Sequence, residues 1–359
     1  MNVPVIELKG SPFEKGFIHG SQMKKQVMVS LETYAHRYSQ QRGLSWEDAK
    51  RLALRFTKVL TGEYEVYLEE MRGIAQGAGL ELGDILALNL RSEILYSSLK
   101  DMHFEADECT AFSAIAPATK DGHALAGQSW DFNIAQREAS FIARIPAEGN
   151  KPAILMFLEG GMVGGKGVSS AGMCLTLNAL TTPRAGIGIP LHVRMRSALE
   201  CKYLTDAMRR CLTTPIPGPV NFTITHKDGL SFSMELDPDG AEVLESEDGL
   251  MVHTNHYIGQ KMRLSHPHSE GGSTYIRLAR MKQLMKGKPL LTIGDFEDFL
   301  KDHAGYPSSI CAHPSPDVPA DKLKYEGATN YAFVADLTEN RLRFVMGNPC
   351  EGSFEDIEF

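Results

Sequence analysis

Two short stretches carry residues that could perform acyl transfer: Cys109-Thr110, which follows Glu108, and Gln128-Ser129-Trp130-Asp131. A cysteine attacks a carbonyl carbon as the thiolate, so it needs a base nearby. A cysteine that becomes the first residue of a chain brings its own base, because a free α-amine titrates near about 7.7–8.0. We therefore predict that Cys109 becomes an N-terminal nucleophile. A buried structural cysteine is the plainer alternative.

Formation of that amine requires cleavage of the bond between Glu108 and Cys109. The Cys109 thiolate would attack the carbonyl carbon of Glu108, and hydrolysis of the resulting thioester would complete the cut. One cysteine would then serve both maturation and turnover.

The segment before this site is predicted to be helical. Apolar residues recur at helical spacing over residues 12–98, and no proline lies between Pro12 and Pro117. Ser45 followed by Asp48 is a variant of the capping box that begins helices. The stretch is expected to form about four helices.

From Cys109 onward the pattern changes to short apolar or alternating segments, which predict strands. Turn signals separate them, at Lys120-Asp121-Gly122, Asp228-Gly229, Asp239-Gly240 and Glu339-Asn340. Helical stretches at 190–212, 273–287 and 293–303 interrupt the strands. Separate runs of strands and helices predict an α+β fold with layered antiparallel sheets, and they disfavour a βαβ pattern. Residues 311–327 are expected to form a long exposed loop.

Composition restricts the partners. A net charge of −8 gives no basic footprint for nucleic acid or an anionic membrane, so small molecules or proteins are the expected partners. The N-terminus lacks the pattern of a signal peptide, and no apolar run approaches the length that spans a bilayer. We expect a cytoplasmic protein. Its six cysteines show no CxxC pair, so reduced thiols are expected.

Three familiar site motifs fail on inspection. A phosphate loop ending at Gly165-Lys166 would need Ser or Thr at the next position, which is Gly167, so a glycine-rich hairpin loop is expected. "GVSSAG" has Ala171 where the serine-hydrolase elbow needs glycine. Neither HExxH nor a Cys-His zinc spacing accompanies the late histidines, so no metal site is predicted. Those histidines are assigned to loop, core and hydrogen-bonding positions: His253, His256, His266, His268, His303 and His313.

The motif around Cys109 resembles the processing site and first hairpin of the acyl-CoA:6-aminopenicillanic acid acyltransferase (isopenicillin N acyltransferase) family. This family, peptidase family C45, is a branch of the N-terminal nucleophile (Ntn) hydrolases. The likeness spans the chain. Its motifs are "GFIHGSQ" (16–22), "RGIAQGAGLELGDILALNLRSEI" (72–94), "DECTAF" (107–112), "GQSWDF" (127–132), "NAL" (178–180), "HTNH" (253–256), "SSIC" (308–311) and "GAT" (327–329).

The resemblance implies a four-layer αββα sandwich with antiparallel sheets and an N-terminal helical segment. It also implies self-cleavage into a helical α part, residues 1–108, and a catalytic β part, residues 109–359, which stay associated. Glu108 and Cys109 would form the processing site. Metal and organic cofactors are not needed for this chemistry.

Site roles can be carried over by position. Cys109 would be the nucleophile, and Asp131 matches the carboxylate that orients its amine. Asn255 matches the oxyanion-hole asparagine. Asn178 is placed like a second, substrate-side asparagine of the related choloylglycine hydrolases. Arg277 is a weaker substrate-side candidate, because an arginine early in an amphipathic helix usually faces solvent.

Two departures from the family pattern bear on function. The family commonly has glycine before the nucleophile, and a side chain at Glu108 limits the backbone there, so self-cleavage could be slow or absent. Glu326 stands where the penicillin enzyme carries a substrate-facing arginine. A carboxylate suits a cation, which favours an N-acyl or β-alanyl amine substrate.

The predicted activity is hydrolysis or acyl transfer on a linear amide through a thioester, with an acyl-CoA or an amine acceptor left open. The α and β parts of the chain, and a homo-oligomer, are the other partners considered. One alternative is an unprocessed thiol hydrolase that pairs Cys109 or Cys311 with His256 or His313, although neither cysteine has a papain-like or caspase-like signature. The other is a catalytically silent binding protein with the Ntn fold.

Overall fold

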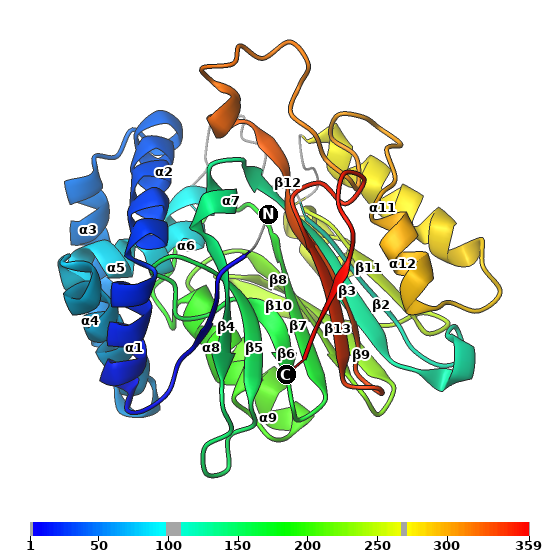
Figure 1. Cartoon of the computed structure of the whole chain (residues 1–359), viewed down its shortest axis with the longest axis horizontal. Coiled ribbons are helices and arrows are strands. Elements are labelled where there is room, and N and C mark those ends of the chain that lie inside the picture. The colour runs from blue at the N-terminus through cyan, green and yellow to red at the C-terminus, as the bar shows by residue number, and fades with distance from the viewer. Residues whose placement is uncertain (1–2, 98–108, 267–270, 359) are drawn as a thin grey trace.

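The computed structural model describes residues 3–97, 109–266 and 271–358. Two β-sheets pack face to face, and helices cover the outer face of each (Figure 1). Strands β2 (Cys109–Ala114) and β3 (Leu125–Asn133) of one sheet contact β7 (Met173–Ala179) of the other, which places these three strands at the interface between the sheets. The predicted four-layer α+β sandwich is confirmed.

The first sheet has eight strands in the order β1-β4-β5-β6-β7-β8-β9-β10. Its neighbouring strands pair antiparallel, except that β1 runs parallel to β4. The strands are β1 (Val5–Glu7), β4 (Ser140–Ile145), β5 (Ile154–Glu159), β6 (Lys166–Ser169), β7 (Met173–Ala179), β8 (Val220–His226), β9 (Leu230–Asp237) and β10 (Gly240–Glu245).

The second sheet has six strands in the order β11-β2-β3-β12-β13-β14, all antiparallel. These strands are β2 (Cys109–Ala114), β3 (Leu125–Asn133), β11 (Leu250–His253), β12 (Gly327–Asp336), β13 (Arg341–Met346) and β14 (Glu355–Ile357). The turn signal at residues 120–122 lies between β2 and β3, as predicted. Asp121 and Gly122 both have positive φ there, at 60° and 76°.

The helices form three groups. Helices α8 and α9 contact β6–β9, and α11 and α12 contact β11 and β12, so each pair covers one sheet. The remaining long helices form an N-terminal lobe, which lies to the left in Figure 1. The helices are α1 (Pro12–Gln22), α2 (Lys24–Arg42), α3 (Trp46–Leu54), α4 (Glu65–Ala78), α5 (Leu82–Asn89), α6 (Arg91–Tyr96), α7 (Gln136–Ala139), α8 (Leu191–Leu199), α9 (Leu204–Leu212), α10 (Gln260–Ser265), α11 (Gly272–Lys286) and α12 (Ile293–Phe299), with short 3₁₀ turns at Arg55–Lys58, Gly62–Tyr64, Lys120–Gly122 and Leu323–Tyr325.

The N-terminal lobe contains six α-helices, so the expectation of about four was wrong. The Ser45 cap is present, since its hydroxyl accepts from the Asp48 amide. The extra breaks fall at Met23, between α1 and α2, and at Leu90, between α5 and α6. Each of these residues leaves the helical region with ψ near +20° (27° and 16°). Neither is Gly or Pro, so the sequence held no signal for the break.

Helices α1 and α4 cross so closely that only glycine fits at the points of contact. A Cβ on Gly16 would lie 1.9 Å from the carbonyl oxygen of Glu70, and one on Gly73 would lie 2.1 Å from that of Phe13. His19, on α1, is buried and accepts a hydrogen bond from the Gly161 amide (3.0 Å), in the loop between β5 and β6. Burial, with the Arg196 charge as a smaller cause, lowers the pKa of His19 to about 3.

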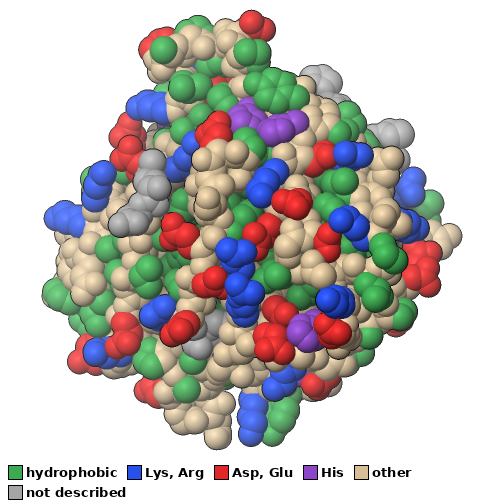
Figure 2. Space-filling view, turned by 45° about the vertical axis from the view of Figure 1, so that its right-hand side comes forward, with side chains coloured by type: hydrophobic (Ala, Val, Ile, Leu, Met, Phe, Trp, Pro, Cys, Tyr) green, Lys and Arg blue, Asp and Glu red, His purple; other side chains and the backbone are tan. Residues whose placement is uncertain are grey.

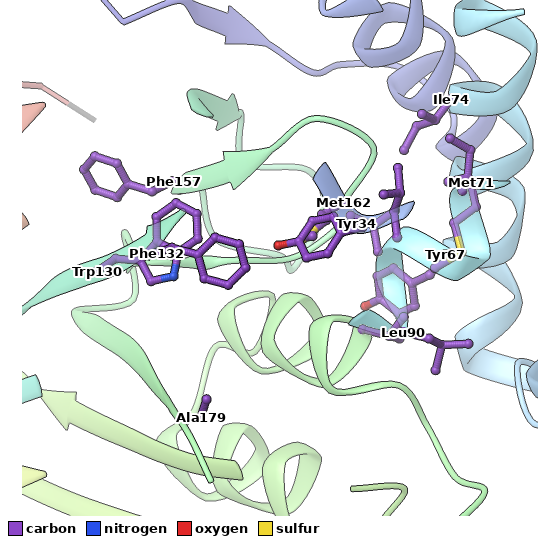
Figure 3. Close-up of a cluster of buried hydrophobic side chains, with 14 of the residues drawn as sticks. Tyr34, Tyr67, Met71, Ile74, Leu90, Trp130, Phe132, Phe157, Met162 and Ala179 are labelled. Atoms are coloured by element: carbon purple, nitrogen blue, oxygen red, sulfur yellow. The ribbon is translucent and has the colours of Figure 1, made fainter. Parts of the chain in front are cut away.

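One hydrophobic core joins the N-terminal lobe to the space between the sheets. Figure 3 shows the rings of Trp130 and Phe132 next to each other, with Tyr34 of the lobe close by and Phe157 on the other side. The Trp130 and Phe132 rings are stacked with centroids 5.2 Å apart. Two further cores lie under α8–α9 and under α11–α12. The strand that carries Trp130 is therefore held from both sides.

Acidic and basic side chains are interspersed over the face seen in Figure 2. Among the described residues, no helix is both long and apolar enough to cross a bilayer. The stretch from 311 to 326 forms mostly loop, as expected.

Candidate active site

Cys109 is the first residue of β2 and is 1% exposed. It lies directly opposite Trp130 of β3, so both side chains share one face of the sheet. That face carries Trp130 and Tyr331 into the core between the sheets. The Cys109 side chain therefore points into the centre of the sandwich.

Polar side chains hold the backbone of Cys109 at both ends. Its N–H donates to Oδ1 of Asn255 (2.8 Å). Its carbonyl oxygen accepts from Nδ2 of Asn178 (3.2 Å) and from Nη1 of Arg277 (2.7 Å). These three holding residues are buried, so water competes little for the bonds. Four predicted site residues thus meet within hydrogen-bond distance of one backbone unit.

Its partners fix the orientation of the Asn255 amide. Oδ1 also accepts from Nη2 of Arg277 (3.0 Å), and Nδ2 donates to the carbonyl oxygen of Ala179 (3.0 Å). In a flipped amide the NH₂ group would face the N–H of Cys109 and the guanidinium of Arg277, and the oxygen would face the carbonyl oxygen of Ala179. The Asn255 oxygen therefore faces the Cys109 nitrogen, while the NH₂ that an oxyanion role requires is bound to Ala179.

Asn178 joins three strands near Cys109. It lies on β7, and its Nδ2 donates to His253 of β11 (3.1 Å) as well as to Cys109 of β2. Its Oδ1 accepts from Nδ2 of Asn221 on β8 (3.2 Å). The asparagine is thus aligned by groups from both sheets.

Arg277 does not face solvent, so that part of the sequence interpretation was wrong. It is 0% exposed and reaches from α11 to the start of β2, where it also donates to Oγ1 of Thr110 (3.2 Å). The helix turns this residue toward the sheet, whereas Ile276 beside it is exposed. Arg277 is one of the best connected residues of the site.

Asp131 follows Trp130 on β3 and is 2% exposed. Oδ1 accepts from the hydroxyl of Thr329 (2.6 Å), and Oδ2 accepts from that of Ser129 (3.4 Å). Successive residues of a strand face opposite sides, so Asp131 points toward the layer of α11 and α12. Its predicted role in orienting the Cys109 amine stays a prediction.

Glu326 lies at the end of the long loop, just before β12. Within the described residues its hydrogen bonds are made by its backbone, which accepts from Ile134 (2.9 Å) and donates to Leu323 (3.1 Å). Register along β12 separates it from Tyr331, the residue that faces Trp130. The structure does not bring the Glu326 side chain into contact with the cluster around Cys109. Glu108 lies outside the described residues.

Comparison with known proteins decides the family. The family model described as acyl-coenzyme A:6-aminopenicillanic acid acyl-transferase matches residues 118–349. The chain belongs to this family. A curated member, the 40 kDa form of acyl-coenzyme A:6-aminopenicillanic-acid-acyltransferase from Emericella nidulans, is 27% identical over 96% of this chain and 92% of its own length. The chain is thus an enzyme of an acyltransferase family.

More distant similarities were also found. An uncharacterized protein of Archaeoglobus fulgidus is 25% identical over 72% of this chain and 51% of its own length. A conjugated bile acid hydrolase from Clostridium perfringens, in a mutant form, shares 12% identity and covers 70% of this chain and 97% of its own, with a TM-score of 0.46. Penicillin V acylase from Agrobacterium tumefaciens shares 12% identity and covers 66% of this chain and 83% of its own, with a TM-score of 0.44. The two structural similarities are too distant to bear on activity.

Sequence reasoning missed one charged residue of this acyltransferase-family site. Lys166 was considered only as a phosphate-loop lysine. It begins β6, is 3% exposed, and its Nζ lies 4.3 Å from the ring centroid of Trp130 and 5.7 Å from that of Tyr331. A cation over these rings is favourable. No pattern along the sequence could have paired β6 with β3 and β12.

The neighbourhood of Lys166 holds further buried charge. Arg91 forms an ion pair with Glu159 (3.1 Å), and its guanidinium lies 5.3 Å from the Phe132 ring. Burial raises the pKa of Tyr331 well above its usual value, and the negative charges of Glu159 and a Cys109 thiolate raise it further. The phenol is therefore neutral and lies close enough to Cys109 to sense its charge.

Of the two histidines considered as alternative bases, His256 is held by hydrogen bonds and His313 lies beside Cys311. Nδ1 of His256 lies within hydrogen-bond distance of Oγ1 of Thr274 (2.8 Å), and burial lowers the pKa of His256 to about 4. His253 contacts Oε1 of Glu235 (2.8 Å). These contacts confirm the hydrogen-bonding roles predicted for both. His313 does lie near Cys311, with Nε2 3.6 Å from Sγ, in a cluster away from Cys109.

Proposed function

We propose that this acyltransferase-family enzyme cleaves itself before Cys109 and then uses the free cysteine to break linear amide bonds through a thioester. One observation carries the proposal. At the first residue of β2, the Cys109 nitrogen is held by a carbonyl-type oxygen, Oδ1 of Asn255, at 2.8 Å. An acceptor at this position suits both a peptide N–H before cleavage and an amine afterwards.

In the maturation step, the Cys109 sulfur attacks the carbonyl carbon of Glu108. The C–N bond to Cys109 breaks, the nitrogen takes the proton of the thiol, and a thioester links the two parts. Water then hydrolyses the thioester and restores the thiol. Asn178 and Arg277 support this step because they hold the Cys109 carbonyl and so limit movement of the residue.

In turnover, the same sulfur attacks the substrate carbonyl and the α-amine accepts the thiol proton. That proton passes to the leaving nitrogen as the amide bond breaks, and water or an acceptor amine then resolves the thioester. Asn255 holds the α-amine in line with the sulfur. Its predicted second role, stabilising the oxyanion, would fall to the Nδ2 hydrogen that is not donated to the carbonyl oxygen of Ala179.

For the substrate, we propose an amide with a negatively charged group. Lys166 and Arg91 lie around Trp130 and Phe132, on the face toward which Cys109 points, and Arg91 is paired with Glu159. The position of these two basic side chains on the Cys109 face favours an anionic substrate over the cationic one inferred from Glu326, which lies before the start of β12 and is separated from Tyr331 along that strand. The fungal relative is named for an acceptor that is itself an acid. N-acyl amino acids are therefore preferred over N-acyl or β-alanyl amines.

Intact-mass analysis with N-terminal sequencing tests the first half of the proposal. We expect purified wild type to give two fragments, one of which begins Cys-Thr-Ala-Phe, and Cys109→Ala to remain a single chain of 39.6 kDa. Cys201→Ala, which changes a half-buried cysteine, is the matched control and should cleave like wild type. A wild-type chain that stays intact after long incubation would refute self-cleavage and return the thiol-hydrolase and silent-binding alternatives.

A further inference from the structure

Four side chains that commonly bind metals meet at the surface, away from Cys109: His303, Cys311, His313 and Cys350. Their ligand atoms all lie within 4.8 Å of one another. The Nε2 atoms of the two histidines are 3.1 Å apart, and the two sulfurs are 3.5 Å apart. The His313 Nε2 lies 3.6 Å from the Cys311 sulfur and 3.4 Å from the Cys350 sulfur.

Four of the six separations match the edges of a tetrahedron around one ion. Zinc binds thiolate sulfur at about 2.3 Å and imidazole nitrogen at about 2.0–2.1 Å. Tetrahedral angles then require edges of about 3.8 Å between sulfurs, about 3.3 Å between nitrogens and about 3.6 Å between sulfur and nitrogen. The four distances given above fall within roughly 0.3 Å of these ideals. The two distances from His303 to the sulfurs are at most 4.8 Å.

We propose that His303, Cys311, His313 and Cys350 form a structural binding site for a divalent zinc-type ion. Two thiolates and two imidazoles are a donor set that zinc favours, and two thiolates neutralise its charge. All four positions are filled by protein, so no position is left open for a substrate. The site is therefore structural and distinct from the Cys109 chemistry.

Neighbouring groups have the arrangement found around metal ligands. Oε1 of Glu351 lies 3.8 Å from Nδ1 of His313, on the side of the ring away from the cluster. A carboxylate at Nδ1 favours a proton there and leaves Nε2 free to bind metal. Nδ2 of Asn348 approaches the Cys311 sulfur at 3.9 Å, which would stabilise a thiolate.

The two cysteines do not form a disulfide in this arrangement, because a sulfur–sulfur bond is about 2.05 Å long. Cys311 is buried, whereas Cys350 and His303 are exposed, so an ion can enter from solvent. The same exposure leaves the pair open to oxidation. Oxidation of Cys311 and Cys350 is therefore the competing outcome that an experiment must distinguish.

The ion would fix the loop after α12 to the turn after β13, two segments far apart in sequence. Next to Cys311, the Ala312 amide donates to Oγ1 of Thr329 (2.9 Å), and the Ala312 carbonyl accepts from the Thr329 amide (3.0 Å). The Thr329 hydroxyl in turn donates to Asp131. Metal binding would thereby hold a neighbour of the candidate active site in place.

No metal site was expected here, because the sequence lacks the spacings of known zinc motifs. In the observed set, Cys311 and His313 are separated by one residue, while His303 and Cys350 come from different parts of the chain. Only the fold brings these ligands together.

The test is metal analysis of the full chain, purified without chelator or a metal-affinity tag from cells grown with zinc. We expect about one zinc per chain in wild type and in Cys201→Ser, and less than about a tenth of that in Cys350→Ser. Because Cys350 is exposed, its replacement by serine should leave the fold intact, which circular dichroism would verify. In wild type, replacement of zinc by Co²⁺ should give the visible absorption of a tetrahedral, thiolate-ligated ion.

Three results would overturn the proposal: wild type without metal after growth in zinc, Cys350→Ser that retains wild-type zinc, or a Cys311–Cys350 disulfide in protein purified under argon. Mass analysis after alkylation identifies the disulfide. None of these measurements depends on cleavage at Cys109, so failure of the metal site and failure of the proposed activity are distinguishable.

Discussion

Replacement of Arg277 by methionine should destabilise the protein by about 3 kcal/mol. The substitution removes three hydrogen bonds from a buried cation, to Cys109, Thr110 and Asn255. Hydrogen bonds to charged groups contribute about 1.5–3 kcal/mol each. The lower value applies to the bonds with the Cys109 and Asn255 oxygens, because each oxygen keeps another donor in the variant. The bond to Thr110 is the longest of the three, at 3.2 Å, and is left out of the sum. Two bonds at the lower value give the prediction.

The measurement is urea unfolding of the Cys109→Ala chain with and without Arg277→Met. This background keeps both proteins uncut, so their unfolding free energies refer to the same covalent chain. It also keeps the backbone oxygen of residue 109 that Arg277 binds. In the wild-type background, Arg277→Met should slow self-cleavage by about a hundredfold, because misplacement of a reacting group by about 1 Å has an effect of that size.

Arg280→Met is the matched control. Arg280 lies one helical turn further along α11, is 32% exposed in its side chain and pairs with Asp302 at 2.7 Å. The pair is partly exposed, and its expected contribution is about 1 kcal/mol, the upper end of the range for surface pairs. Equal destabilisation by the two substitutions, or unchanged cleavage in Arg277→Met, would refute the reasoning that Arg277 holds the nucleophile.

Two further predictions concern charge. Burial lowers the pKa of His19 to about 3. Below pH 6.5 this side chain is therefore protonated in the unfolded chain and stays neutral in the folded chain. Between pH 6.5 and 5 the free energy of unfolding of wild type should therefore fall by about 1.6 kcal/mol more than that of His19→Gln. Glutamine can still accept the hydrogen bond from the Gly161 amide. Equal losses for the two proteins, measured by urea unfolding at both pH values, would contradict this. Lys166→Met should reduce kcat/KM for N-acyl amino acids at least about tenfold more than for N-acyl amines, and an equal reduction on both would refute the proposed substrate charge.

Prediction of the fold from the sequence succeeded where the signal was local. Hydrophobic periodicity separated the helical segment from the strands, and turn residues such as Asp121-Gly122 identified the connection from β2 to β3. The breaks at Met23 and Leu90 were missed, because neither position carries the Gly or Pro that marks a helix break in a sequence.

The candidate site was predicted in part. The motif around Cys109, with Asn178 and Asn255, identified residues that do meet, since these were carried over from a family whose fold the chain shares. The direction of the Asn255 amide could not be predicted. It depends on Arg277 and Ala179, which approach it from a helix and a strand far away in sequence.

By itself the sequence determined the class of chemistry and the layered fold, because a cysteine motif and hydrophobic periodicity are properties of neighbouring residues. The tertiary structure decided what lies around that cysteine. It buried Arg277 against the Cys109 carbonyl, set Lys166 over Trp130, and gathered His303, Cys311, His313 and Cys350 at one point. Each of these contacts joins segments that only the packing of strands and helices brings within bonding distance.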